Sequence, residues 1–171
     1  MSLMPSLSPM DQVILHISTC DNATLASYSS TGRYPMPIAD LVRQATSDRL
    51  QLAGAHLRDG DALLRAGQFR SSISRHYYAM YHAARAITYA ATAGDDHQQH
   101  SRLTRNLPAP LAARQQMETD LSDARLLRNS ADYDPYPPNE SDWEAEARGL
   151  SVTAARFVQS CDDFALKQGF V

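Results

Sequence analysis

The side chains of this chain that are best suited to chemistry fall in two short stretches. The first, RHYYAMYHAARA, covers residues 75–86 and combines guanidinium, imidazole and phenol groups. On a helix, four of its polar side chains share one face within an arc of about 80°. They are Arg75, Tyr78, His82 and Arg85. Arginine forks bind phosphate and aromatic faces stack on bases, so this face is a candidate phosphate or nucleotide site.

The second stretch, RLLRNSADYDPY, covers residues 125–136 and ends a predicted helix. A cation such as Arg128 is favourable near a helix C-terminus by itself. Asn129 and Asp132 are residues that cap helices or turn the chain. Ordinary structural roles therefore explain most of this stretch when it is taken alone.

The helix that carries the first stretch lacks the usual surface residues. From Ser71 to Ala93 there is no Asp, Glu, Lys, Asn or Gln. Such a helix is central and packed on both sides, and its polar groups need partners. We expect the carboxylates of residues 118–134 to pair with Arg75 and Arg85. The polar face is then an internal network of Arg, His, Tyr and Asp; a phosphate or nucleotide cleft and a metal or other ligand site are the alternatives.

Helical spacing of apolar residues dominates the chain after Pro37. The first long helix is expected to end at Gly67. Later helices are expected after an N-cap at Ser71 or Ser72, over residues 98–106, from Pro110, and after a capping box at Ser141 and Glu144. The apolar face of the last helix comprises Trp143, Ala147, Leu150, Ala154, Phe157, Cys161 and Phe164. Long helices with short connections predict an all-α fold, an antiparallel up-and-down bundle of four to five helices.

The first 37 residues differ from the rest of the chain. They are rich in Ser, Thr, Pro and Met and show no helical apolar face. We expect residues 1–37 to form an irregular arm or linker, with a short strand over residues 12–18, and residues 38–171 to form the helical bundle.

Composition narrows the class of protein further. The chain has 171 residues, 43% hydrophobic, with a net charge of −3, which favours one domain with a core. Cys20 and Cys161 show no metal-type spacing and are expected to be thiols in a reducing compartment. No basic leader precedes an apolar core and no apolar run approaches a membrane span, so we expect a cytoplasmic protein. Neither a metal nor another cofactor is expected.

Together the two stretches resemble the HEPN superfamily, in particular a bacterial subgroup with a YYAMFHAARA helix and a later RxxADY motif. Residues 77–86 read YYAMYHAARA and residues 128–133 read RNSADY. His100, Ser101 and Leu103 also match the usual pattern of the subgroup. The resemblance covers residues 40–166 and implies a helical bundle that is usually a homodimer.

Many HEPN proteins are metal-independent ribonucleases of toxin–antitoxin, CRISPR and other defence systems, and others are partners of minimal nucleotidyltransferases. In the ribonucleases an Arg and a polar residue precede a His that moves the proton. The resemblance thus implies catalytic roles for Arg128 and Asn129, with Asp132 and Tyr133 near the position of that His. No His lies downstream of His100.

Because the motif His is missing, we expect a homodimeric regulatory HEPN protein of a toxin–antitoxin or related defence module without efficient catalysis. Its expected partner is RNA, a nucleotide, or a cognate antitoxin or nucleotidyltransferase. The ligand-binding candidates are Arg75, Tyr78, His82, Arg85 and His100. One alternative is a metal-independent endoribonuclease that uses Arg128 with a His or Asp supplied in space. The other is a structural dimeric interaction module.

Overall fold

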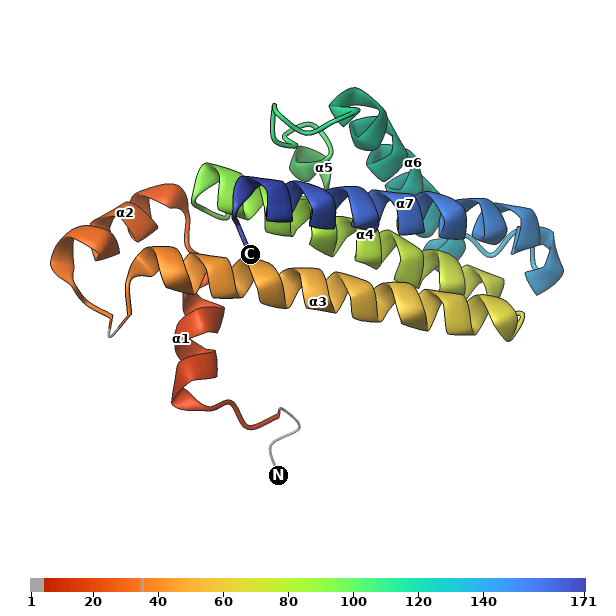
Figure 1. Cartoon of the computed structure of the whole chain (residues 1–171). Coiled ribbons are helices and arrows are strands. Elements are labelled where there is room, and N and C mark those ends of the chain that lie inside the picture. Colours follow the sequence, from red (N-terminus) through yellow and green to blue (C-terminus); the bar gives the residue numbers. More distant parts are fainter. Residues whose placement is uncertain (1–4, 35) are drawn as a thin grey trace.

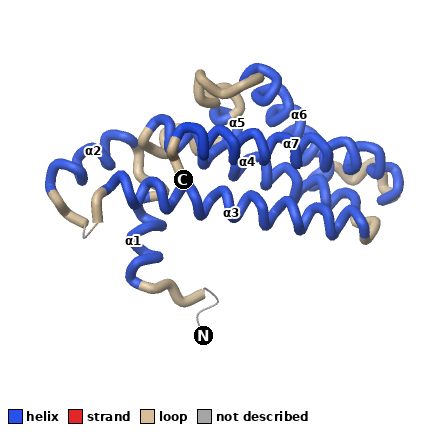
Figure 2. The backbone as a smooth tube through the Cα atoms, in the orientation of Figure 1, coloured by secondary structure: helices blue, strands red, loops and turns tan. Residues whose placement is uncertain are grey.

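The computed structural model describes residues 5–34 and 36–171, and Figure 1 shows its longest helices packed side by side. The helices are α1 (Pro9–Ile17), α2 (Asn22–Thr31), α3 (Ile38–Arg65), α4 (Phe69–Thr92), α5 (His100–Leu103), α6 (Arg114–Tyr133) and α7 (Glu144–Gln168), with a 3-10 turn η1 (Glu140–Trp143). No strand occurs among the described residues (Figure 2). The predicted all-α class is therefore confirmed.

Helix α4 is the centre of the bundle. It contacts α3 along its length and also packs on α6 and α7, and α6 is inclined to the other long helices in Figure 1. Ala79, Ala83 and Ala86 on α4 are fully buried, and their small side chains let neighbouring helices approach closely. The expectation of a central helix is confirmed.

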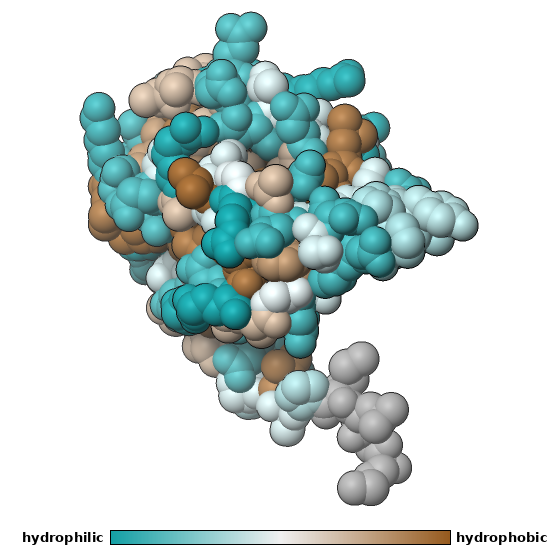
Figure 3. Space-filling model, turned by 90° about the vertical axis from the view of Figure 1, so that its right-hand side faces the viewer, coloured by the Kyte–Doolittle hydropathy of each residue, from teal (hydrophilic) through white to brown (hydrophobic). Residues whose placement is uncertain are grey.

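The apolar face predicted for the last helix packs into the same core as α4. All seven of its residues, from Trp143 to Phe164, are buried. In contrast, the end of the bundle that faces the viewer in Figure 3 is mostly hydrophilic, with scattered apolar side chains. Single exposed apolar residues of this kind are normal on a globular surface.

The turn between α3 and α4 has the predicted glycine. Gly67 has a φ of 71°, and the amide groups of Gly67 and Gln68 donate to the carbonyls of Leu64 and Leu63 at 3.1 and 3.0 Å. This is the pattern of a Schellman end. Helix α4 nevertheless starts before the predicted Ser cap, because tertiary contacts hold its first turn: Arg70 N–H donates to Glu140 Oε1 at 2.7 Å.

Two other predicted helix starts are also wrong. Helix α6 begins at Arg114 rather than Pro110, because Ala113 has a φ of 52° and bends the chain just before it. The capping box at Ser141 does not form, since Glu140–Trp143 make a 3-10 turn without a side-chain cap. The short helix predicted over residues 98–106 is confined to His100–Leu103.

The N-terminal segment is helical where we expected an irregular arm and a strand. Helix α1 includes most of the predicted strand over residues 12–18. A capping box between Ser8 and Asp11, with Pro9 at the first position, starts this helix. Ile17 of α1 and Leu25 of α2 are buried against the bundle, in a second cluster of Ile17, Cys20, Leu25, Leu41, Ala45 and Tyr89. Burial against α3 and α4 adds to these local signals in α1 and stabilises α2, whose sequence shows little periodicity.

Candidate functional site

Four helices bring a group of imidazole, phenol and guanidinium side chains together. We call His56, Tyr78, His82, His100 and Arg128 the His–Arg cluster. Tyr78 and His82 lie one turn apart on α4, so both face the same neighbours. His56 comes from α3, His100 from α5 and Arg128 from α6.

The rings of the His–Arg cluster are packed against one another. His56 and His82 are stacked, with centroids 5.2 Å apart and planes 3° apart. His56 also lies 5.8 Å from the ring of Tyr78. On the other side, His100 stacks on Tyr81 at 4.1 Å, and a hydrogen bond joins His100 Nδ1 to the hydroxyl of Tyr77. Both ends of the row of rings are thus held in place.

Arg128 connects this row of rings to the RxxADY motif. Its guanidinium donates to the Tyr78 hydroxyl at 2.9 Å, and its Nε lies 2.7 Å from Asp132 Oδ2. It also donates to Asn129 Oδ1 at 3.3 Å and lies 5.3 Å from the ring centre of Tyr133. Asp132 therefore compensates much of the Arg128 charge, while the Tyr133 ring stays 71% exposed beside it.

Burial keeps the imidazoles of the cluster uncharged at neutral pH. Burial lowers the pKa of His82 to about 4, with smaller effects from His56 and Arg85. The pKa of His100 is lowered by burial and then by the positive charge of Arg128. Burial also lowers the pKa of His56. Neutral rings can accept a proton and can stack on other rings without repelling a neighbouring cation.

Two of the predicted ligand residues lie outside the His–Arg cluster, Arg85 in a separate ion pair and Arg75 at the exposed edge beside His56. Arg85 forms an ion pair with Asp95, and Arg75 is exposed and lies 3.3 Å from His56 Nδ1. The expected pairing of these arginines with the acids of residues 118–134 is wrong for Arg85, because the turn after α4 places Asp95 closer. Acids of that segment pair instead with Arg114 on α6 and Arg156 on α7.

A chain of Ser, His and Asp side chains that the sequence pattern did not predict runs from a buried serine to the half-exposed Asp61. Ser72 Oγ lies 3.2 Å from His76 Nδ1, and His76 Nε2 lies 3.1 Å from Asp61 Oδ1. Ser72 and His76 are both fully buried, so no substrate reaches the hydroxyl. The chain links α3 to α4 and is structural; the spacing of Ser72 and His76 by four residues was its only signal in the sequence.

The described residues contain no group of three or more His, Cys, Asp or Glu side chains that could hold a metal ion. Asp95, in the turn before His100, pairs with Arg49 and Arg85. Cys20 and Cys161 are buried free thiols. Within the described part of the chain, no helix is both long and apolar enough to span a membrane.

Comparison with known proteins identifies the class. The family model of the HEPN domain matches residues 46–162. The chain therefore belongs to the HEPN domain family. The match covers helices α4 to α6 and most of α3 and α7, so it includes every residue of the His–Arg cluster. No curated protein and no solved structure matches the chain.

Proposed function

We propose that this HEPN protein is a homodimeric regulatory component of a toxin–antitoxin or related defence module that binds RNA at the His–Arg cluster without efficient catalysis. The observation that carries the proposal is the position of Arg128 between the Tyr78 hydroxyl and the exposed Tyr133 ring. A guanidinium beside exposed aromatic rings suits single-stranded RNA, whose phosphates bind cations and whose bases stack. Tyr136, which is 75% exposed, adds a second ring nearby in the sequence.

Weak catalysis is proposed because Arg128 already has a counter-ion. Asp132 lies 2.7 Å from Arg128 Nε and reduces the positive charge available to a phosphoryl transition state. The RNSADY segment also contains no histidine.

A metal-independent endoribonuclease is the second candidate. It is favoured by the pKa of His100, which is lowered by burial and by the charge of Arg128. A neutral imidazole beside an arginine could take the proton of a ribose 2′-hydroxyl and so replace the missing motif histidine.

One experiment separates these candidates. Binding and cleavage of tRNA and of a structured mRNA would be measured in EDTA for the wild-type chain, Arg128→Ala and His100→Ala. Arg102→Ala, an exposed arginine on α5, is the control. We expect binding without cleavage, weakened about tenfold in Arg128→Ala with a shallower salt dependence.

Other outcomes would identify the alternatives. EDTA-resistant cleavage that disappears in Arg128→Ala and His100→Ala would establish the ribonuclease. If the wild-type chain binds no RNA, the structural interaction module is the remaining candidate. In that module Arg85→Ala lowers thermal stability and changes no ligand affinity. The proposed dimer is checked separately by light scattering, where a monomeric mass at high concentration would contradict it.

A further inference from the structure

A pocket of about 410 Å³ lies between helix α1 and the α3–α4 pair, apart from Arg128. We call it the α1 pocket. Its lining combines apolar side chains of α1 and α3 with the cationic side chains of Arg49 and Arg85 and the neutral ring of His82. The whole of α1 precedes the part of the chain that the HEPN family model matches.

The buried charges at the α1 pocket are not balanced, although exposed carboxylates also line it. Arg49 and Arg85 both pair with one carboxylate, that of Asp95. The side chain of Arg49 is only 10% exposed, that of Arg85 16% and that of Asp95 2%. The neutral ring of His82 compensates neither cation, so the buried guanidinium groups of Arg49 and Arg85 share the single carboxylate of Asp95. Unbalanced buried charge is costly, and an anionic ligand would relieve that cost.

Arg49 shows the effect of this imbalance. Burial lowers its pKa, the positive charge of Arg85 lowers it further, and Asp95 opposes both effects. Beyond Asp95, its guanidinium donates to the backbone carbonyl of Ser18. A carbonyl oxygen accepts this hydrogen bond but does not neutralise the charge.

Exposed leucines form part of the mouth of the α1 pocket, beside the exposed side chains of Asp11 and Asp48. Leu7, Leu15 and Leu52 line the pocket and are 45%, 55% and 43% exposed. Exposed leucines around one opening would be covered by the apolar part of a ligand.

Two exposed carboxylates at the same pocket restrict the ligand. Asp11 and Asp48 also line it. Asp11 accepts from the backbone N–H of Ser8 at 2.9 Å, and Asp48 accepts from Gln44 Nε2 at 2.8 Å. Their charges lie in water, yet they repel a dianion such as phosphate more than a monoanion.

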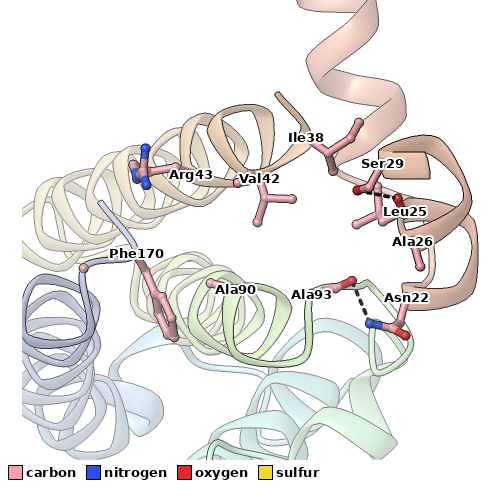
Figure 4. Close-up of a pocket in the computed structure, with 12 residues that line it drawn as sticks. Asn22, Leu25, Ala26, Ser29, Ile38, Val42, Arg43, Ala90, Ala93 and Phe170 are labelled. Atoms are coloured by element: carbon pink, nitrogen blue, oxygen red, sulfur yellow. Dashed lines mark hydrogen bonds between the residues drawn. The ribbon is translucent and has the colours of Figure 1, made fainter. Parts of the chain in front are cut away.

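A second cavity lacks this combination of features. It measures about 370 Å³ and lies between α2, α3, the end of α4 and Phe170 (Figure 4). Leu25 and Val42 contribute to its apolar walls. Its one charged lining residue, Arg43, points away from the cavity in Figure 4 and pairs with Asp40 at 2.9 Å.

We propose that the α1 pocket binds a small monocarboxylate with an apolar chain. The carboxylate lies against the guanidinium groups of Arg49 and Arg85, and the chain lies along Leu15 and Leu52. This site is distinct from the proposed RNA site at Arg128, so either proposal can fail without the other.

The test is calorimetric titration of the full chain with octanoate at pH 7. We expect saturable binding at one site, with 1-octanol, n-octylamine and inorganic phosphate each at least about tenfold weaker. Leu52→Gln should weaken octanoate binding about fivefold through lost apolar contact. Val152→Gln, at a 71% exposed site on α7 outside the pocket, should leave it unchanged.

Three results would overturn the proposal. The first is no octanoate binding. The second is 1-octanol or phosphate binding as tightly as octanoate. Equal binding of octanol would show that the carboxylate is not needed, and equal binding of phosphate would show that the apolar chain is not needed. The third is equal octanoate affinity in wild type and Leu52→Gln, which would place the ligand elsewhere. Because Leu52 is partly exposed, its variant is expected to fold, and circular dichroism checks this.

Discussion

At the scale of single residues, the environment rather than the residue type sets the chemistry of the His–Arg cluster. His82 is an ordinary imidazole in the sequence, but in the fold it stacks on His56 and lies near Arg85. Burial and these neighbours penalise its charged form. The pKa of His100 is lowered in the same direction, although the residue is partly exposed and its ring only stacks on those of Tyr77 and Tyr81.

This protonation state predicts a pH dependence of stability. The pKa of His82 is about 4 in the folded chain, against 6.5 for an unperturbed histidine. Between these values the unfolded chain binds a proton that the folded chain does not bind. The stabilisation is therefore complete above pH 6.5 and is lost as the pH falls towards 4. His82→Gln should make the decline in unfolding free energy from pH 7 to pH 5 less steep in urea titrations.

The pKa itself is measurable by NMR titration of the His82 ring protons. A midpoint below pH 5 is expected. A midpoint close to 6.5 would show that the ring is solvated and would remove the basis for this pH dependence.

At the scale of elements, the long helices are joined by contacts that no single helix contains. The guanidinium of Arg70, in the first turn of α4, donates to the carbonyl of Ala131 at 2.8 Å and lies 4.7 Å from the ring centre of Trp143. It thereby gives a hydrogen-bond partner to a carbonyl in the last turn of α6, which has none within the helix, and joins this end of α6 to η1. In the same way, the His76 ring fills the space beside Gly60 of α3.

Two helical glycines should respond to alanine in opposite directions. A Cβ at Gly60 would lie 2.8 Å from Nε2 of the fully buried His76 ring, so Gly60→Ala should destabilise by about 1–3 kcal/mol. Gly149 on α7 has no atom within 4 Å of its Cβ position, so Gly149→Ala should stabilise by about 0.5–1 kcal/mol. Denaturant unfolding of both variants checks this. If both alanine variants are destabilised, the local helix environment rather than the contact with His76 determines the effect of the substitution.

At the scale of the whole molecule, the N-terminal helices are joined to the bundle through buried polar contacts as well as apolar ones. Figure 1 shows α1 and α2 beside the start of α3 and the end of α4. The hydroxyl of Tyr89 donates to the Ile17 carbonyl at 2.9 Å, and the Asp95 amide donates to the Cys20 carbonyl at 2.9 Å. The same region forms one wall of the α1 pocket.

Removal of the Tyr89 hydroxyl should loosen α1 without changing the bundle. Tyr89→Phe removes one of two hydrogen bonds to the Ile17 carbonyl, which also accepts from the Cys20 N–H at 3.2 Å, and should cost about 1 kcal/mol. Hydrogen exchange should become faster in residues 9–17 and remain unchanged in α7. Tyr136→Phe, at a 75% exposed site, is the control. Unchanged exchange in residues 9–17 would show that apolar packing alone holds the arm.

The sequence was sufficient for features that depend on local periodicity. The all-α class, the central position of α4 and the buried face of α7 follow from the spacing of apolar residues and the lack of surface residues over 71–93. The end of the first long helix at Gly67 was also predicted from the sequence, because a residue with positive φ at a helix end favours glycine whatever the rest of the fold.

The composition of the candidate site depended on the fold. His56 is isolated in the sequence and joins the cluster only because α3 packs on α4. Arg85 pairs with Asp95 because the turn after α4 folds back, although the acids of α6 seemed suitable by charge. Helix α2 required burial in the cluster of Leu41 and Tyr89, whereas the capping box of α1 is a local signal that the sequence already contained. Short-range spacing specifies a helix and its buried face, whereas charge pairs and ring contacts depend on how distant helices are rotated against one another.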